Sequence, residues 1–289
     1  MAHRFFINGQ EQSSTQQHQF DVADRAFSYG DGIFETINVI EGRIPLWKYH
    51  LQRIEKSCHK LSINVDQALP QIEDFLQQNV FSDSDSKTLK IIISRGCTER
   101  GYGAPSDLAA NWYAFIFPKA STKQPSTGTE LDQILTVSHV TLASQPLLAG
   151  VKHLNRLEQV LAKQALNDSD YSDALMLDQN GNVIETIMAN VFWLKDGVIY
   201  TPELTQQGVE GVVRSWLMDQ DTPYEIGRYP LEDLLSADEC FITNSLMGVK
   251  SIAGIDVFPN REDFASEKKE IRFSKSEIGQ KLSSLFQQA

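Results

Sequence analysis

The sequence predicts an α+β protein of two domains, and three observations support that class. Its 289 residues exceed the usual length of one domain, which is about 150 residues. Helix-like and strand-like segments are interspersed without the strict alternation of a doubly wound parallel sheet. The segment 118–130 is rich in Ser, Thr, Pro and Lys, lacks an apolar period and is typical of a linker. We therefore expect a smaller domain at 1–117 and a larger one at 131–289.

The first domain is expected to combine strands with two helices. The segment 4–10, RFFINGQ, predicts a strand that runs into an Asn-Gly turn, which is a strong hairpin signal. The segment 33–47 predicts two strands joined by a turn at Glu41 and Gly42. Helical spacing is present at 47–61 and 71–81, and strands are expected at 88–96 and 111–118.

The second half is expected to begin with a strand at 134–140 and a helix that opens within 150–163. In that helix Leu154, Leu157 and Leu161 recur at the spacing of one apolar face, and Lys152 stands just before the stripe. The remaining predictions are strands with Asn-Gly and Asp-Gly turns at 173–202, a helix with a glycine-rich start at 208–220, a strand–turn element at 239–252 and a helix in the charged tail after Arg261.

Composition excludes several classes of protein. A net charge of −12 without a Lys/Arg cluster argues against a nucleic-acid partner. No segment approaches the ~20 apolar residues of a membrane span, and the N-terminus does not resemble a signal peptide. Cys58, Cys97 and Cys240 are scattered and indicate no disulfide framework, so a cytoplasmic location is expected. The six histidines are isolated, so no metal site is expected.

The glycine-rich stretch SYGDGIFET does not fit a dinucleotide-binding motif. Glu35 occupies the place of the third glycine, and the stretch precedes a strand instead of joining a strand to a helix. The sequence also contains no phosphate loop of the GxxxxGK[ST] type and no GxSxG nucleophile elbow. Nucleotide-binding and serine-hydrolase functions are therefore disfavoured.

Lys152 and Glu185 have residue types that a pyridoxal phosphate enzyme requires. Such an enzyme needs a lysine for the imine, an acid facing the pyridine nitrogen and donors for the phosphate. A lysine at a desolvated helix edge is a competent amine nucleophile, although a lysine taken alone is far more often a surface charge. Glu185 lies among apolar residues in a strand, where a carboxylate must find a partner unless it turns to solvent at a strand edge.

Phosphate donors are expected in three places. A glycine-rich helix start binds anions through backbone N–H groups, although it could also be a plain helix cap. Arg53 offers a charge-assisted donor, or else a surface ion pair. The helix start contains Gly211, Val212 and Val213. The third place is a turn with small donors at Thr243, Asn244 and Ser245.

Five ordered motifs then resemble the fold type IV pyridoxal phosphate enzymes, whose fold is like that of D-amino-acid aminotransferase. The motifs are DRAFSYGDGIFETI at 24–37, HLQRI at 50–54, ISRGCTERGY at 93–102, LLAGVKHLNRLEQVLAK at 147–163 and ETIMANVFW at 185–193. The AGVKHLNRLEQ segment and the RGY loop are most similar to the aminodeoxychorismate lyases within this group. The resemblance extends from Phe5 to about Ile252.

The resemblance implies a role for each candidate residue. Lys152 matches the Schiff-base lysine and general base, carried by the larger domain, and Glu185 matches the acid at the pyridine nitrogen. Arg53 matches the phosphate-binding arginine. Thr36 falls where a catalytic and substrate-binding residue is expected, and Arg100 where the substrate carboxylate is bound. The remaining phosphate contacts match Gly211, Val212, Val213, Asn244 and Ser245, with one departure, because this chain has Gly248 where relatives often carry proline.

The implied reaction converts 4-amino-4-deoxychorismate to 4-aminobenzoate and pyruvate with pyridoxal 5'-phosphate, a step of folate biosynthesis. The resemblance also implies a homodimer. Two alternatives remain open at this stage. The first is a branched-chain or D-amino-acid aminotransferase on the same scaffold, and the second is a binding protein that has kept the fold without catalysis.

Overall fold

A computed structural model of the chain describes residues 3–12, 21–81, 85–118, 133–273 and 277–288. The chain forms two compact units. Unit 1 contains Met1–Thr122 and Val151–Asn155, and unit 2 contains Lys123–Gly150 and Arg156–Ala289. The segment that carries Lys152 therefore belongs to unit 1, whereas the sequence analysis placed it in the larger C-terminal domain. The expected linker lies outside the described residues except for Pro118.

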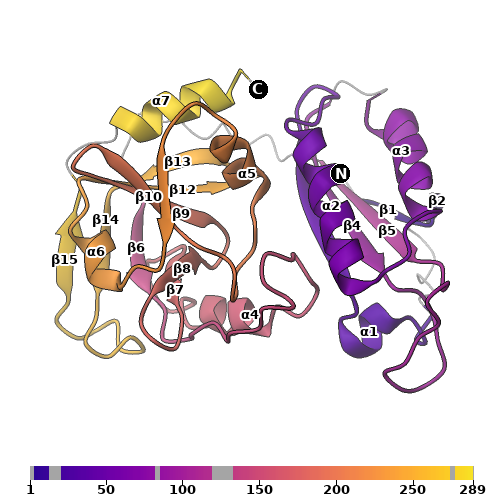
Figure 1. The fold of residues 1–289 in the computed structure, drawn as a ribbon, viewed down its shortest axis with the longest axis horizontal. Helices are drawn as coiled ribbons and strands as arrows, with labels where there is room; N and C mark the ends of the chain where they lie inside the picture. The colour runs from indigo at the N-terminus through magenta and orange to yellow at the C-terminus, as the bar shows by residue number, and fades with distance from the viewer. Residues whose placement is uncertain (1–2, 13–20, 82–84, 119–132, 274–276, 289) are drawn as a thin grey trace. The chain divides into compact units, whose positions relative to one another are not determined.

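Unit 1 is a five-stranded antiparallel sheet whose strand order is β2-β1-β5-β4-β3. The helices α2 and α3 pack on it, as Figure 1 shows, and contribute Ile54, Cys58, Ile72 and Leu76 to one core with the sheet. The elements are β1 (Arg4–Ile7), β2 (Gln10–Gln12), α1 (Arg25–Tyr29), β3 (Gly32–Val39), α2 (Trp47–Leu61), α3 (Ala68–Asn79), β4 (Lys87–Ser94) and β5 (Asn111–Pro118).

Two turns in unit 1 test the sequence analysis directly. The Asn-Gly hairpin is confirmed, because Asn8 and Gly9 adopt φ values of 47° and 82° between β1 and β2. Of the two strands expected at 33–47, the first is confirmed as β3, and the turn at Glu41 and Gly42 forms with φ values of 51° and 74°, but the second strand is wrong. After β3 the chain makes only the isolated bridge between Ile40 and Arg43, and α2 begins at Trp47. Pro45 lacks an N–H group and cannot extend a returning strand by pairing there.

Unit 2 contains two five-stranded mixed sheets, with strand orders β11-β10-β9-β12-β13 and β15-β14-β6-β7-β8. Apolar side chains from both sheets form one core, which includes Leu135, Leu175, Val191, Trp193 and Ile242. The strands are β6 (Ile134–Val137), β7 (Ala174–Leu177), β8 (Val183–Thr186), β9 (Asn190–Lys195), β10 (Val198–Pro202), β11 (Tyr224–Gly227), β12 (Glu239–Asn244), β13 (Gly248–Ile252), β14 (Gly254–Val257) and β15 (Lys269–Arg272).

The helices of unit 2 are short and lie at the surface of the sheets. Figure 1 shows α7 running along β12 and β13, with α5 beside them. The predicted helix start at Gly211 is confirmed, since Gly211 is the N-cap of α5. The helices are α4 (Leu157–Gln164), α5 (Val212–Met218), α6 (Leu231–Leu235) and α7 (Glu277–Phe286). None of the helices in the described part of the chain has the length and apolarity needed to cross a membrane.

The helix expected to open within 150–163 begins later than its apolar spacing predicted. Residues 152–154 pair with β3 through an isolated bridge between His153 and Ile33, and Leu154 donates its N–H to the carbonyl of Gly32 at 3.0 Å. A Cβ at Gly32 would lie 2.9 Å from Leu154 Cδ1 and 2.4 Å from the Ile93 carbonyl oxygen, so glycine is required for this approach. Leu154 therefore pairs with the edge strand β3, and the helix begins only at Leu157.

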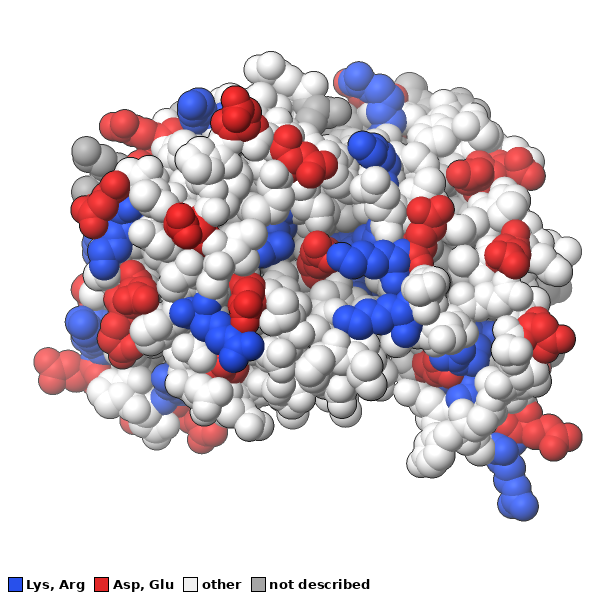
Figure 2. Space-filling view, in the orientation of Figure 1, with Lys and Arg blue, Asp and Glu red and all other residues white. Residues whose placement is uncertain are grey.

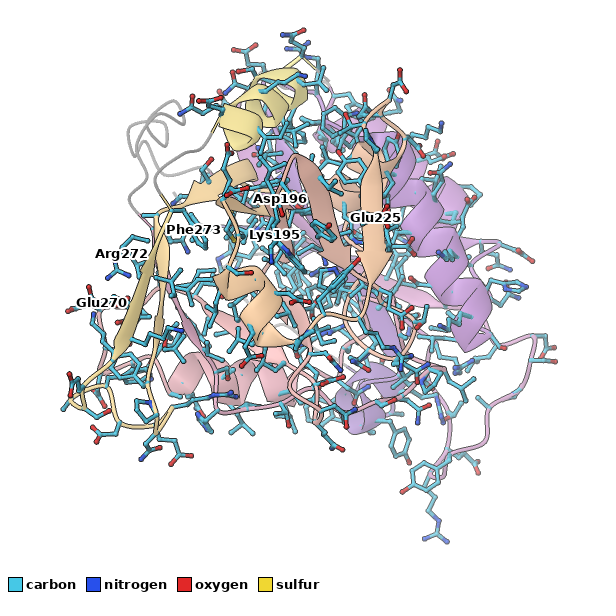
Figure 3. All side chains as sticks on the ribbon, turned by 60° about the vertical axis from the view of Figure 1, so that its left-hand side comes forward. Lys195, Asp196, Glu225, Glu270, Arg272 and Phe273 are labelled. Carbon is cyan, nitrogen blue, oxygen red and sulfur yellow. The ribbon has the colours of Figure 1, made fainter. Side chains whose placement is uncertain are left out.

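The charged tail after Arg261 is anchored to unit 2 by β15. In Figure 3, Glu270 and Arg272 project from the outer side of this strand, whereas Phe273 lies on its inner side and is buried. Arg272 and Lys268 both pair with Asp256 of β14, whose side chain is buried. Figure 2 shows acidic and basic side chains interspersed over the visible face of the molecule.

Candidate active site

The candidate residues fall into two groups, one in each unit. Unit 1 contains Thr36, Arg53, Arg100 and Lys152. Unit 2 contains Glu185, Gly211, Val212, Val213, Asn244 and Ser245.

Lys152 is held by backbone pairing with β3 and its amine lies over an aromatic ring. The Lys152 carbonyl accepts the N–H of Phe34 at 2.9 Å. The Lys152 Nζ lies 4.3 Å from the centroid of the Phe34 ring, within the range of a cation–π contact. The side chain is only partly exposed. Pairing of the backbone on an edge strand, together with this contact, restricts where the amine can point.

Thr36 lies on the same face of β3 as Phe34, because side chains two residues apart in a strand point to the same side. In the neighbouring strand Lys90 is in register with Thr36, and its Nζ lies 5.4 Å from the Phe34 ring. Phe34 is therefore flanked by the amines of Lys90 and Lys152 on the face that carries the Thr36 hydroxyl. This arrangement is compatible with the predicted catalytic role of Thr36.

The opposite face of β3 carries a buried charge network that includes Arg53. Glu35 is 2% exposed, and its two carboxylate oxygens accept the Nε and Nη2 groups of Arg53 at 2.8 and 2.5 Å. His50, one turn earlier on α2, donates its Nδ1–H to the same carboxylate at 2.7 Å. The bidentate pair fixes the plane of the guanidinium. Arg53 is therefore a rigid, buried cation and not the surface ion pair that the sequence left open.

The network has a defined protonation pattern. Burial alone raises the pKa of Glu35, but the charge of Arg53 and the hydrogen bonds from His50 and Arg53 lower it from 4.5 to about 2. Burial lowers the pKa of His50, and the charges of Arg53 and Lys152 act in the same direction, against the effect of Glu35. At neutral pH, Glu35 is therefore an anion and His50 a neutral donor. The effect of Lys152 on His50 links its amine to this network electrostatically.

Glu35 and His50, which form this network with Arg53, were not among the residues predicted from the sequence. Two signals were available for them. Glu35 lies between Ile33 and Ile37 on the buried face of a strand, where a carboxylate requires a partner. His50 and Arg53 are three residues apart on a helix and therefore share a face. What joins these two segments is a contact between α2 and β3 that local spacing does not reveal.

Replacing Glu35 with glutamine is expected to destabilise unit 1 by about 3–5 kcal/mol at neutral pH, because it removes the carboxylate that pairs with the buried Arg53 charge. The pKa of Glu35 is lower in the folded chain than its usual 4.5, so its stabilising effect is complete above pH 4.5 and is lost as the pH falls toward 2. Urea unfolding between pH 7 and pH 3 measures both effects.

The matched control is Glu73→Gln on α3, where the carboxylate is exposed. We expect the control to unfold like the wild-type protein, and Glu35→Gln to show a shallower loss of stability below pH 4.5. Equal acid sensitivity in all three proteins would contradict the assignment of the buried charge to Glu35.

Arg100 lies in the exposed loop between β4 and β5, on a rigid support. Beneath this loop Arg25 is 4% exposed, and its guanidinium donates to the carbonyls of Gly101 and Tyr102 at 3.0 and 2.8 Å. Arg25 also pairs with Asp31 at 2.8 Å. Arg25 thus supports the backbone of the loop next to Arg100, and the contact of Arg100 with the substrate remains a prediction.

In unit 2, Glu185 is buried on β8, at 4% exposure. Its Oε2 accepts the backbone N–H of Val209 at 2.9 Å. The exposed strand-edge position that the sequence left open is therefore excluded. A buried carboxylate of this kind suits a cationic partner, such as a protonated ring nitrogen.

Asn190 ties the Glu185 region to the start of α5 and was not singled out by the sequence analysis. Its Nδ2 donates to the carbonyl of Val209 at 2.8 Å, and its Oδ1 accepts the N–H of Gly211 at 3.1 Å. A Cβ at Gly211 would lie 2.1 Å from Asn190 Oδ1, so this position requires glycine. Beyond the cap, the N–H groups of Val212 and Val213 belong to the first turn, where no intrahelical carbonyl is available.

The turn after Glu185 is held by a second buried carboxylate. Asp173 accepts the Thr186 hydroxyl at 2.7 Å and the Ile187 N–H at 3.1 Å. Burial raises the pKa of Asp173 to about 6, although these hydrogen bonds oppose the increase. The Asn244 amide then donates to the carbonyl of Met188 at 3.3 Å, so the β12–β13 turn contacts the same segment.

The β12–β13 turn has an ordered backbone and a buried hydroxyl beside it. Asn244 Oδ1 accepts the N–H groups of Leu246 and Met247 at 3.0 and 2.9 Å, which closes the turn. Thr243 is 1% exposed, and its Oγ1 has no hydrogen-bond partner in the described part of the chain. A buried hydroxyl without a partner is costly unless a ligand satisfies it. The donors here fit a phosphate group.

An amine on a restrained lysine, a buried carboxylate and a set of small donors fit the three functional parts of pyridoxal phosphate. The comparisons with known proteins identify the chain as a pyridoxal phosphate enzyme of fold type IV. The family model for amino-transferase class IV matches residues 32–255, and the chain belongs to this family. It is a pyridoxal phosphate-dependent enzyme with the α+β fold predicted from its sequence.

The relatives include both lyases and aminotransferases. An aminodeoxychorismate lyase from Vibrio harveyi is 37% identical, over 90% of this chain and 94% of its own. One from Bacillus subtilis is 29% identical, over 78% of each chain. The crystal structure of 4-amino-4-deoxychorismate lyase from Pseudomonas aeruginosa matches with a TM-score of 0.83 and 30% identity, over 98% of both chains. D-alanine aminotransferases also match, at 27% identity or less.

Proposed function

We propose that this enzyme converts 4-amino-4-deoxychorismate to 4-aminobenzoate and pyruvate, which places it in folate biosynthesis. The observation that carries the proposal is its greater similarity to aminodeoxychorismate lyases than to aminotransferases of the same family. The buried Glu185 and the restrained Lys152 supply the acid and the amine that such chemistry requires. The three cysteines are free thiols, which supports a location in the cytoplasm.

The residues of both groups are proposed to hold one cofactor. Lys152 bonds its carbonyl carbon and Glu185 faces its ring nitrogen. Arg53 binds the phosphate, with its guanidinium oriented by Glu35. The other proposed phosphate contacts are Gly211, Val212, Val213, Asn244 and Ser245. When bound, pyridoxal phosphate supplies an electron sink for the carbon that carries the substrate nitrogen.

The chain's own residues then move protons and orient the substrate. The Lys152 amine would take the proton from the substrate ring carbon that carries nitrogen. The enolpyruvyl oxygen leaves with its electron pair as the ring becomes aromatic, and protonation of the departing fragment gives pyruvate. Thr36 lies on the same strand face as Phe34, whose ring contacts the Lys152 amine, and would relay a proton there. Arg100 binds a substrate carboxylate through its planar guanidinium.

The reaction is tested by incubating the purified holoenzyme with 4-amino-4-deoxychorismate and measuring 4-aminobenzoate by its fluorescence. We expect multiple turnovers with no added amino-group acceptor. The alternative function is amino transfer between branched-chain or D-amino acids and 2-oxo acids. That alternative predicts complete conversion of the cofactor to its pyridoxamine form by an ordinary amino acid, with no 4-aminobenzoate.

A homodimer is proposed from an exposed apolar face on α4. Leu157, Val160 and Leu161 are 74, 47 and 52% exposed, and nearby in the sequence Leu147 is 74% exposed. Apolar side chains grouped in this way at a surface are typical of a protein–protein interface. A second copy of the chain is the proposed partner, because the resemblance to fold type IV enzymes implies a dimer.

The double substitution Leu157→Glu and Leu161→Glu is expected to convert the dimer to a monomer, because it places charges in an apolar interface. Analytical ultracentrifugation measures the mass directly. Lys163→Glu changes the charge on the same helix away from the apolar face and should leave the dimer intact. A dimer that persists in the double variant would exclude this face as the interface.

A further inference from the structure

The C-terminal helix α7 lies outside the part of the chain that the family model matches, which ends at residue 255. It is nevertheless firmly seated on unit 2. Glu239 is buried, and its carboxylate accepts the N–H of Ile278 at 3.0 Å at the start of the helix. A Cβ at Gly279 would lie 2.4 Å from Ser251 Oγ, so glycine permits a close approach of the helix to β13. Leu282 is 2% exposed on the same helix.

The last residue of α7 contacts the β12–β13 turn. Gly248 has a φ of 70° and is the residue that pairs with Asn244 to close the turn. A Cβ at Gly248 would lie 2.6 Å from Cδ1 and 2.7 Å from Cε1 of Phe286. The aromatic ring of Phe286 thus occupies the space that any other residue at 248 would require. This accounts for the departure from proline noted in the sequence.

The same ring also contacts α5. Phe286 and Trp216 pack edge to face, with ring centroids 5.6 Å apart and an interplanar angle of 77°. Trp216 is 7% exposed and lies on α5, whose first turn carries Gly211, Val212 and Val213. One side chain therefore packs against both elements to which phosphate contacts are assigned.

The buried hydroxyl of Thr243 gives an independent indication that a ligand binds at this turn. Thr243 immediately precedes Asn244, and its Oγ1 is without a partner in the described part of the chain. A phosphate oxygen is an acceptor of the kind that this donor lacks. The position of the turn relative to α5 then determines whether one phosphate group can reach donors on both.

We propose that Phe286 is a positioning residue for the cofactor phosphate. By packing against Gly248 and Trp216, its ring holds the Asn244–Ser245 turn and the start of α5 at the spacing that one phosphate group requires. The inference rests on the proposed phosphate contacts and assigns to the C-terminal helix a role in cofactor affinity. Phe286 itself does not touch the cofactor.

Binding of two ligands to the apoenzyme tests this role. Pyridoxal 5'-phosphate carries the phosphate, and pyridoxal offers the same ring and carbonyl without it. Phe286→Ala is expected to weaken pyridoxal phosphate binding by about tenfold, while pyridoxal binding changes by less than about twofold. Leu285→Ala, at the adjacent and more exposed position, is the matched control and should affect neither ligand. Phe286→Leu keeps most of the bulk and should restore much of the affinity.

Two outcomes would overturn the proposal. The first is an equal loss of affinity for both ligands, which indicates a general effect on folding. The second is unchanged affinity for pyridoxal phosphate in a folded Phe286→Ala protein. If that variant does not fold, the same two affinities are measured for Phe286→Leu. We then expect a smaller loss of affinity, for pyridoxal phosphate alone. An equal loss for both ligands, or no loss for either, would contradict the proposal. A wild-type protein that binds pyridoxal phosphate but releases no 4-aminobenzoate would reject the proposed reaction and leave this comparison valid.

Discussion

Replacing Lys152 with alanine is expected to remove the visible absorption band of the bound cofactor and to lower turnover by at least about 10²–10⁴-fold, the usual contribution of a general base. The reason is that the same amine is proposed to bond the cofactor and to take the substrate proton. Borohydride reduction of the wild-type holoenzyme, followed by peptide mass spectrometry, should locate the cofactor on Lys152.

Lys163→Ala is the matched control for Lys152. Lys163 lies eleven residues later on α4, is exposed, and its Nζ donates to the Ser172 carbonyl at 2.6 Å. The control should keep both the band and the activity. If the band survives in Lys152→Ala, another lysine carries the cofactor and the assignment is wrong.

The second large effect is expected at Glu185. Replacing it with glutamine keeps the volume of the side chain but removes the negative charge that is proposed to hold the pyridine nitrogen protonated. Turnover should fall by roughly 10²–10³-fold, comparable to the loss of one preorganised electrostatic group. Cofactor binding should be affected less, because Lys152 and the phosphate donors remain. The measurement is turnover at saturating cofactor, with the pH dependence of the visible band as a second readout.

Glu225→Gln on β11 is the control for the charge change, and Figure 3 shows that this exposed residue projects from the edge strand. It should leave turnover unchanged. A Glu185→Gln protein that retains activity within about threefold of the wild type would contradict the proposed role. If Glu185→Gln only destabilised the fold, it would lower the thermal unfolding temperature but would not change the pH profile of the visible band.

Local signals predicted the turns and the placement of most candidate residues on their elements. Asn8-Gly9 and Asp196-Gly197 adopt positive φ at both residues, as their residue types favour. Glu185 lies in a buried strand and Gly211 caps a helix, as the sequence indicated. Each of these predictions depends on a few neighbouring residues, which is why it could be made without the fold.

The start of α4 could not be predicted from spacing because a distant partner competes for the chain. Leu154 has the correct period for the helix, but its N–H instead bonds Gly32, which lies 122 positions earlier in the chain. As a result Leu157 and Leu161 are exposed on a short helix and are not part of a core. The spacing of apolar residues predicts a helix with one apolar face, but it does not identify which part of the protein packs against that face.

The partners of the charged groups were equally inaccessible to sequence reasoning. Arg53 was singled out by its motif, but its orientation depends on Glu35, which is 18 positions away on β3. Asn190 was not singled out at all, although it bridges Val209 and Gly211. These contacts require the packing of helices on sheets and the pairing of separate loops, and no local pattern encodes them.

The measurement that tests the lyase chemistry most directly is product stoichiometry in the absence of any 2-oxo acid. Purified holoenzyme is mixed with excess 4-amino-4-deoxychorismate, and 4-aminobenzoate and pyruvate are quantified over many turnovers, with Lys152→Ala as the blank. We expect equal amounts of the two products and a cofactor that stays in its original form. A protein that makes no 4-aminobenzoate, and transfers amino groups only when a 2-oxo acid is added, would contradict the proposed function.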